Sequence, residues 1–376
     1  MPEHKPQSVL IVGAGIAGLT AAIALSQKGY VCEVAEITPA GEPIGAALTI
    51  TGRAIETLAV IGLLADCQAI GHVNCLSGEH YDSAGAPIGE KTPTGRTPPA
   101  SLGTYRPVLS RLLIDQALAC GVRIRWSTSI DALTQTADIV SVRFTDGTDG
   151  QFDLLVGADG IRSRVRQLVF GDATRPQYTG QMSVRWMAEG PPIPAPAMMY
   201  YAPGVKLLGY ALPKQQLIYV TTVSDHKVPL HPDHDAARLL LAGHLRLFTA
   251  PYAREIAKRL TPASNVIVRP FEWLLVPSPW YRGRVLLIGD AAHATTAHLA
   301  SGGGMAMEDG VVLAECLAAA PSLGAGLEAF MQRRFDRVRI VVDGSVEISE
   351  LEQQGAAPSL LAARVGQAFR QLAQPF

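Results

Sequence analysis

Short apolar runs alternate along the chain with longer segments in which apolar residues recur at helical spacing, and this alternation predicts an α/β fold. The first run covers residues 9–12 and leads through a glycine-rich turn into an alanine- and leucine-rich helix that ends at Lys28. A second β-rich run follows at 31–34, and later apolar runs at 152–157 and 284–288 each end in a short polar motif. These units predict a Rossmann-like dinucleotide-binding domain.

The middle of the chain has a different pattern. Several β-rich runs begin after residue 179, and a helix-rich stretch follows at 233–259. We also predict a helix over about 53–64 and two short strands around residues 82–85. These patterns predict a discontinuous dinucleotide-binding domain over 1–75, 100–178 and 277–350. An inserted β-sheet substrate domain covers 76–99 and 179–276, and a C-terminal helix covers 351–376. The tail after Pro358 has apolar residues at helical spacing, so we expect it to dock on the chain's own core.

The composition narrows the classes of partner. With 376 residues the chain is long enough for two domains and a buried cofactor, and its net charge of -1 gives no basic surface for nucleic acid or anionic lipid. Its five cysteines show no CxxC spacing, and neither a signal-peptide core nor an apolar run of membrane length is seen. We therefore expect a cytoplasmic protein that acts on a small molecule, with neither nucleic acid nor membrane as a partner.

The turn after the first strand has the sequence of a dinucleotide-binding loop, formed by Gly13, Ala14, Gly15, Ile16, Ala17 and Gly18. Gly13 permits the tight turn, Gly15 lets the backbone approach a pyrophosphate, and Gly18 lets the helix pack closely on the strand. Glu36 follows at the distance expected for a carboxylate that binds a ribose. Glycine-rich turns also join ordinary strands and helices, but the strand before, the helix after and Glu36 favour a dinucleotide site.

Two further motifs follow apolar runs. Asp159-Gly160 precedes a basic helix, and taken alone it is typical of a turn with a capping aspartate. Gly289-Asp290 places a carboxylate at the carboxyl end of a buried strand, where open α/β sheets bind ligands. The glycines Gly302, Gly303 and Gly304 then precede a helix over 305–319, whose positive end could stabilise an anionic ring system, although a flexible linker would explain the glycines too.

The order of these three motifs resembles that of the flavin-dependent aromatic hydroxylases, the family of para-hydroxybenzoate hydroxylase and salicylate hydroxylase. The resemblance covers residues 8 to about 340. It implies a Rossmann-like FAD-binding domain with an inserted β-sheet substrate domain, and FAD as the bound dinucleotide. It further implies that NADPH or NADH visits transiently, that the reduced flavin takes up O2 as a C4a-hydroperoxide, and that one oxygen passes to an aromatic or polycyclic phenol-like substrate. The chain agrees with a transient nicotinamide, because no second glycine fingerprint follows a strand.

The resemblance also implies roles for individual residues. Glu36 would hold the adenosine ribose, Arg106 the diphosphate-side linker, and Asp290 the ribityl or pyrophosphate portion. The Asp159-Gly160 turn would lie near the FAD and the nicotinamide approach, and the Gly302–Gly304 loop beside the isoalloxazine.

The chain departs from the family pattern on the substrate side. Ala297 stands where the family usually has proline, Ser301 replaces the glutamine of a Gln-Gly pair, and Gly52-Arg53 replaces Pro-Asn. Backbone groups do most of the FAD binding, so these departures leave the FAD assignment intact and bear on the geometry near the reacting flavin edge.

Candidate pocket side chains lie on the predicted strands of the substrate domain. They are Met182, Trp186, Tyr200, Tyr201, Tyr210 and Tyr219. Aromatic residues favour strands in any case, so we expect only a minority of them to line the pocket. The sequence does not identify a general base; His298, beside the flavin loop, is the candidate. The group His231, Asp233, His234 and Asp235 resembles a metal site, but beside Pro232 it favours a turn and helix cap, and we predict no metal.

Three functions fit this sequence. The first is an FAD-dependent, NAD(P)H-consuming monooxygenase that uses O2 to hydroxylate a small aromatic molecule. The second keeps the fold but acts as a reductase or oxidase of a lipid or polyketide, and the third is a flavin-binding sensor without turnover. The choice between NADH and NADPH, and between monomer and homodimer, stays open at this stage.

Overall fold

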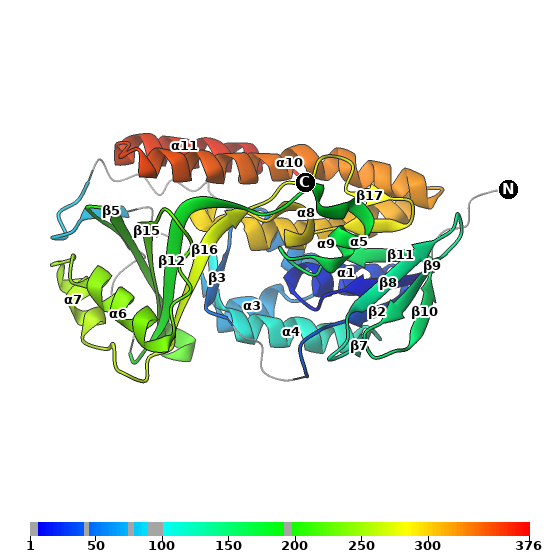
Figure 1. Cartoon of the computed structure of the whole chain (residues 1–376), viewed down its shortest axis with the longest axis horizontal. Helices are drawn as coiled ribbons and strands as arrows, with labels where there is room; N and C mark the ends of the chain where they lie inside the picture. The colour runs from blue at the N-terminus through cyan, green and yellow to red at the C-terminus, as the bar shows by residue number, and fades with distance from the viewer. Residues whose placement is uncertain (1–6, 41–44, 74–78, 89–100, 192–197) are drawn as a thin grey trace.

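The computed structural model describes residues 7–40, 45–73, 79–88, 101–191 and 198–376. Figure 1 shows two bodies side by side, with a β-sheet and two helices on the left and an α/β body on the right. Two long helices, α10 (Leu323–Gln353) and α11 (Pro358–Leu372), run along the top of the view. The described helices include none that is long and apolar enough to cross a bilayer.

The α/β body is built on a six-stranded sheet. Its order is β17 (Tyr281–Arg282), β18 (Val285–Leu287), β11 (Leu154–Gly157), β1 (Ser8–Val12), β2 (Val31–Ala35) and β7 (Arg123–Arg125). All neighbours pair in parallel except β17 with β18. The central strands are buried and read as continuous apolar runs, as expected where helices cover a parallel sheet. The covering helices are α1 (Ile16–Gln27), α4 (Arg106–Ala119), α5 (Arg164–Phe170), α8 (Asp290–His293) and α9 (Gly302–Ala319).

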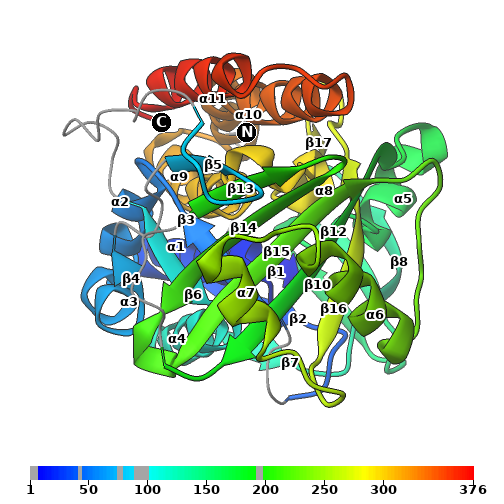
Figure 2. The same cartoon turned by 90° about the vertical axis from the view of Figure 1, so that its left-hand side faces the viewer.

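The second body is a six-stranded sheet with one covered face. Its order is β16 (Val266–Trp273), β12 (Gln177–Glu189), β15 (Leu217–Asp225), β14 (Val205–Leu212), β13 (Met198–Ala202) and β5 (Glu79–Asp82). The strands pair antiparallel except β13 with β5. The helices α6 (His234–Leu245) and α7 (Pro251–Ala257) lie over one face, in front of the sheet in Figure 2. Their apolar residues share a core with alternate residues of the strands. We call this the helix-covered face, and the opposite one the inner face.

Two small sheets complete the chain. One joins β3 (Ala47–Ile50), β6 (Leu102–Tyr105) and β4 (His72–Val73), and it lies between the two bodies in Figure 1. The other joins β10 (Asp149–Phe152), β9 (Val140–Phe144) and β8 (Ile130–Gln135). The tail docks on its own core as predicted, because Leu361 and Ala368 of α11 pack with Ile348 of α10 and with Leu299.

The structure corrects several local predictions. The helix expected over 53–64 is shorter. It is α2 (Ala54–Val60), which ends before Gly62 because that residue adopts a φ of 79° that a helix cannot continue through, and a separate helix, α3 (Leu64–Ile70), follows. The helix α9 begins at Gly302, so the three glycines form its first turn rather than a loop before it. The sequence analysis also did not identify β8 or β16. Residues 74–78 and 89–100 lie outside the described residues, so the assignment of 76–99 to the substrate domain stays a prediction for that part.

Candidate cofactor and substrate site

The three sequence motifs meet through close backbone approaches. A Cβ atom built on Gly13 would lie 2.5 Å from the carbonyl oxygen of Ala158, next to the Asp-Gly motif. A Cβ atom on Gly289 would lie 2.7 Å from the Cβ of Ala17, on the first helix. Both glycines have positive φ angles, 109° and 57°. The sequence needs glycine at these positions because the three motifs pack against one another without side chains between them.

The glycine-rich turn leaves space for a ligand at its middle position. A Cβ atom on Gly18 would lie 1.9 Å from the carbonyl oxygen of Gly13, so Gly18 is needed for the turn itself. A Cβ atom on Gly15 meets nothing within 4 Å, although Gly15 is the N-cap residue of α1. The backbone at the start of this helix is therefore open to a phosphate, which the helix dipole would favour.

Glu36 lies beside this turn. Its Oε2 accepts a 2.6 Å hydrogen bond from the backbone N–H of Ala14, and its Oε1 accepts from the N–H and the hydroxyl of Thr38. A carboxylate fixed next to the glycine turn at the end of β2 suits a ribose hydroxyl, which it could bind with its remaining lone pairs.

Asp159 stabilises the Asp-Gly turn and the start of α5 through hydrogen bonds. Its carboxylate accepts hydrogen bonds from the hydroxyl of Ser163 and from the N–H groups of Arg164 and Val165 at 2.5, 2.7 and 3.0 Å. Burial raises the pKa of Asp159, and these hydrogen bonds oppose the rise. The aspartate thus accepts from free N–H groups in the first turn of α5, whose N-cap residue is Ser163, and it holds the turn beside Gly13.

Asp290 lines an open internal space. Its side chain is exposed, yet enough protein surrounds it that desolvation raises its pKa, while the charges of His293 and Arg106 act to lower it. Exposure and desolvation occur together where a carboxylate faces a solvent-filled site inside the fold. Arg106 is also exposed and stands at the start of α4, so the structure brings these two predicted residues together.

The glycines at the start of α9 allow close packing and also leave part of the backbone exposed. A Cβ atom on Gly303 would lie 3.0 Å from a methyl of Leu48 on β3, and one on Gly304 would lie 2.7 Å from the Cβ of Ala54 on α2. The flexible-linker alternative is wrong, because these residues are helical and closely packed. The first turn of an 18-residue helix is therefore held against β3, with Gly302 and Gly303 partly exposed.

A buried charge network holds the Gly-Asp motif, and the sequence analysis missed it. Asp309 accepts a 2.9 Å hydrogen bond from the N–H of Gly289 and a 2.6 Å bond from His293 Nε2. Arg334 is fully buried and pairs with both Asp309 and Glu308, at 2.8 and 2.6 Å. Desolvation acts to raise the pKa of Asp309, but the charges of His293 and Arg334 outweigh it and the pKa is lowered. The adjacent acidic pair inside a predicted apolar helix was the signal that could have found this network.

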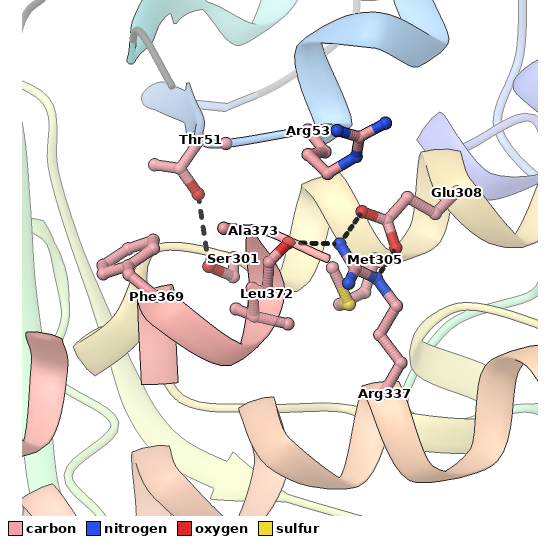
Figure 3. A pocket seen from close by; sticks show the side chains of 10 residues that line it. Thr51, Arg53, Ser301, Met305, Glu308, Arg337, Phe369, Leu372 and Ala373 are labelled. Atoms are coloured by element: carbon pink, nitrogen blue, oxygen red, sulfur yellow. Dashed lines mark hydrogen bonds and ion pairs between the residues drawn. The ribbon is translucent and has the colours of Figure 1, made fainter. Parts of the chain in front are cut away.

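The same network reaches the end of the chain (Figure 3). Arg337 donates to both carboxylate oxygens of Glu308 and to the carbonyl oxygen of Leu372. The pocket around these residues has a volume of only about 10 Å³, with room for roughly one water molecule. Ser301 lies on its wall and hydrogen-bonds Thr51 at 3.2 Å. An aromatic substrate cannot bind there.

The two faces of the antiparallel sheet divide the predicted pocket residues. Side chains of a strand alternate between faces, and Met182, Trp186 and Tyr200 lie in the core under α6 and α7. All three were candidate pocket residues, and this placement corrects those predictions. Tyr210 and Tyr219 lie on the inner face, in one cluster with Met187 and with Ala47 and Tyr105 of the β3–β6 sheet. Tyr210 also hydrogen-bonds Thr49 at 3.1 Å.

Tyr201 and His298 lie at the end of the inner face that α10 covers. Tyr201 bonds His80 at 3.0 Å, and His298 Nε2 lies 3.0 Å from Gln181 Oε1 and 3.3 Å from Glu352 Oε2. Because both of those oxygens accept, Nε2 carries the proton and Nδ1 accepts from the Thr296 hydroxyl at 2.7 Å. Both ring nitrogens of His298 are therefore occupied, and its side chain is 1% exposed, so it does not present a base to a substrate in this conformation.

The cap interpretation holds for the histidine- and aspartate-rich turn. Asp233 accepts a 2.8 Å hydrogen bond from the N–H of Ala236 and caps α6. No cluster of three metal-ligand side chains lies among the described residues.

Comparison with known proteins identifies the family. A family model described as FAD binding domain matches residues 7–217 and 258–345. The chain belongs to this family. It is 31% identical to 3-amino-4-hydroxybenzoate 2-monooxygenase of Streptomyces cremeus, over 88% of this chain and 83% of that protein, and 29% identical to FAD-dependent urate hydroxylase of Klebsiella pneumoniae, over 89% and 87%. These relatives place it among the FAD-dependent aromatic-hydroxylase-type monooxygenases, and the predicted resemblance is confirmed.

The fold agrees with this family. The crystal structure of Klebsiella pneumoniae HpxO with FAD and uric acid matches with a TM-score of 0.83 at 24% identity, covering 98% of this chain and 96% of that one. The predicted FAD-binding fold is therefore confirmed. These residues fit FAD. The turn at Gly15 offers open backbone amides, Glu36 offers a carboxylate acceptor for the ribose, and the exposed pair Arg106 and Asp290 offers a cation and a further acceptor.

Proposed function

We propose that this flavoprotein is an NAD(P)H-consuming monooxygenase that hydroxylates a small aromatic molecule. The observation that carries the proposal is the position of the inner face. Its aromatic side chains Tyr210 and Tyr219 share a cluster with β3, and β3 packs against the first turn of α9. The partly exposed Tyr219 and the buried Tyr210 are therefore linked through β3 to the glycine turn that we assign to the flavin ring.

The residues of the FAD site each have a proposed task. The open backbone from Gly13 to Gly18 binds the pyrophosphate, Glu36 binds the adenosine ribose, and Arg106 and Asp290 bind the linker. Asp159-Gly160 and Gly289 hold these parts together, and Gly302 to Gly304 bring helix amides to the flavin ring. Bound FAD supplies the chemistry, the transfer of one oxygen atom of O2 to the ring after reduction by NADPH or NADH. The protein binds the substrate ring, orients it and excludes water.

A groove beside the Asp-Gly motif supports a transient nicotinamide site. It has a volume of about 490 Å³ and is lined by Arg162, Arg166, Gln167, Asp172, Thr174, Arg175, Pro176 and Glu272. Arg166 donates a 2.9 Å hydrogen bond to the carbonyl oxygen of Ala291, next to Asp290, so the groove wall contacts the Gly-Asp motif directly. Arg175 is exposed, and within the part of the chain that the structure describes it pairs only with the exposed Asp172, so a nicotinamide phosphate could replace that partner.

The test follows oxygen and reducing equivalents. Purified holoprotein is mixed with NADH or NADPH and a panel of phenols, and both NAD(P)H oxidation and 18O from 18O2 in the product are measured. Ligand-stimulated oxidation with 18O in the product supports a hydroxylase. Stimulated oxidation without 18O supports a reductase or oxidase, and the absence of any stimulation supports a flavin-binding sensor. In the Arg175→Gln variant, we expect KM for NAD(P)H to rise roughly threefold to tenfold with kcat unchanged.

A further inference from the structure

The last turn of α11 lies against the first turn of α9, whose glycines we assign to the flavin ring (Figure 3). The wall of the pocket between them includes Phe369 and Leu372 of α11 and, at the start of α9, Ser301 and Met305. The pocket has a volume of about 10 Å³, so it holds roughly one water molecule. Because so little space separates the two helices, a displacement of α11 would also displace the start of α9.

Arg337 of α10 joins the last turn of α11 to α9. Its terminal nitrogens donate to the carbonyl oxygen of Leu372 at 2.9 Å and to that of Gln374 at 3.0 Å. Carbonyl groups at the end of a helix lack partners within the helix, so Arg337 satisfies acceptors that α11 leaves open. The same guanidinium donates to both carboxylate oxygens of Glu308 on α9, at 2.7 and 3.0 Å. Arg337 is only 8% exposed, so these groups are its environment in place of water.

Arg334 continues the connection to both parts of the proposed FAD site. It pairs with Glu308 and Asp309 at 2.6 and 2.8 Å. It also donates to the carbonyl oxygen of Met305, which directly follows the glycines of α9, at 3.1 Å. Asp309 in turn accepts from the N–H of Gly289 at 2.9 Å. One set of buried contacts therefore fixes the start of α9 and the Gly-Asp motif together.

The charges of this network balance only while Arg337 is in place. Within the ranges that the structure describes, Glu308 forms ion pairs only with Arg334 and Arg337. Without Arg337, Arg334 is the single guanidinium beside two buried carboxylates. It would then be drawn toward Glu308 and would hold Asp309 less firmly, because an uncompensated buried carboxylate is costly.

We propose that Arg337 is a positioning residue of the FAD site and that it couples the docking of α11 to the affinity for FAD. The inference rests on the FAD site proposed above. The docked helix orients Arg337, which neutralises Glu308. Arg334 is then free to hold Asp309 against Gly289. Because a coupling between two sites is reciprocal, bound FAD stabilises the docked position of α11 by the same factor.

The first experiment measures FAD affinity. FAD release from diluted holoprotein is followed by the rise in flavin fluorescence, which gives Kd. We expect Arg337→Met to raise Kd roughly tenfold, and Arg337→Lys to raise it less because lysine keeps the charge without the paired donors. The matched control is Arg364→Met, which removes an exposed ion pair with Glu347 between the same two helices and should leave Kd within about twofold. Trp186→Ala, which loosens a core away from the FAD site, controls for lost stability.

The second experiment needs no variant. Hydrogen exchange of the wild-type chain is compared with and without FAD, by mass spectrometry of peptides from α11 and from α6. We expect exchange in α11 to slow roughly threefold or more when FAD is bound, with little change in α6, because local opening of α11 is coupled to the site. Equal slowing of both helices would refute the coupling, since it would report only a general stabilisation of the fold.

The affinities separate this inference from the site on which it rests. Asp290→Asn removes a charge of the proposed FAD site and should raise Kd. An unchanged Kd in Asp290→Asn would show that the FAD site is assigned wrongly. A raised Kd in Asp290→Asn with an unchanged Kd in Arg337→Met would sustain the site and refute the role of Arg337. An effect of Arg337→Met no larger than that of Trp186→Ala would refute it too, and if Arg337→Met does not fold, Arg337→Lys and hydrogen exchange decide.

Discussion

The two large sheets of this protein differ in how directly their sequences report what they do. The parallel sheet is buried on both faces, so ligand-binding groups gather at the carboxyl ends of its strands, where Gly13, Asp159 and Gly289 converge. The antiparallel sheet has one face under α6 and α7 and one facing the FAD-binding part. Its alternation predicts two faces but does not say which of them meets the ligand. Motifs thus locate a cofactor site in the first sheet, while in the second only packing separates core from pocket.

We expect the largest effect at two glycines of the glycine-rich turn, one of which is needed for folding and the other for cofactor binding. Gly18→Ala places a methyl 1.9 Å from a carbonyl oxygen, so it should prevent stable folding or lower the free energy of unfolding by about 3 kcal/mol or more. Gly15→Ala meets no protein atom within 4 Å, so the apoprotein should keep its Tm while FAD affinity falls. Thermal unfolding and flavin absorbance measure both effects. An unstable Gly15→Ala apoprotein would show that the turn is not open.

The next effect concerns the charges behind the Gly-Asp motif. Arg334→Met leaves Asp309 and Glu308 buried without their shared cation, and should cost about 3 to 5 kcal/mol in the free energy of unfolding. On the same helix, Arg339 pairs with Asp336 at the surface, and Arg339→Met should cost no more than about 1 kcal/mol. Urea unfolding of both variants makes the comparison. Equal losses would contradict the structural role of the buried network.

The two faces of the antiparallel sheet can be tested with adjacent residues of β12. Trp186→Ala empties a site in the core under α6 and should lower the free energy of unfolding by about 3 kcal/mol, with ligand affinity unchanged in the folded fraction. Met187 lies on the inner face. Met187→Ala should weaken the binding of aromatic ligands, with a smaller loss in the free energy of unfolding. Urea unfolding and flavin-perturbation titrations measure the two quantities. The reverse outcome would show that the two faces of the sheet have been assigned wrongly.

The smallest effect is a pH dependence at the junction of the inner face with α10. Desolvation acts to raise the pKa of Glu352, but the charge of Lys206 and the contacts of His298 prevail and lower it to about 2. A depressed carboxylate pKa stabilises the fold above the unfolded pKa, and this stability is lost as pH falls through the folded value. Between about pH 5 and pH 2, Tm should therefore fall more steeply for the wild type than for Glu352→Gln. Parallel Tm profiles would refute the ion pair.

Several residues show where prediction from sequence stopped. Glu36 and Asp290 were found because their spacing follows from strand and turn geometry. Met182 and Trp186 were misplaced because the two faces of a strand have similar composition when both are largely apolar. The roles of Asp309 and Arg334 were invisible, since the two residues stand 25 positions apart in sequence and meet only when α9 and α10 pack together. His298 has the position of a candidate base, but Gln181, Glu352 and Thr296 engage both its nitrogens.

The sequence by itself determined the family, the α/β fold and the dinucleotide motifs, because those depend on local backbone requirements that glycine and acidic residues meet at fixed spacing. Only the tertiary structure decided which side chains reach a substrate. It gives Lys206 on the inner face a largely buried partner, Glu352, from the far end of the chain. Burial and pairing are set by long-range packing, which no local spacing encodes.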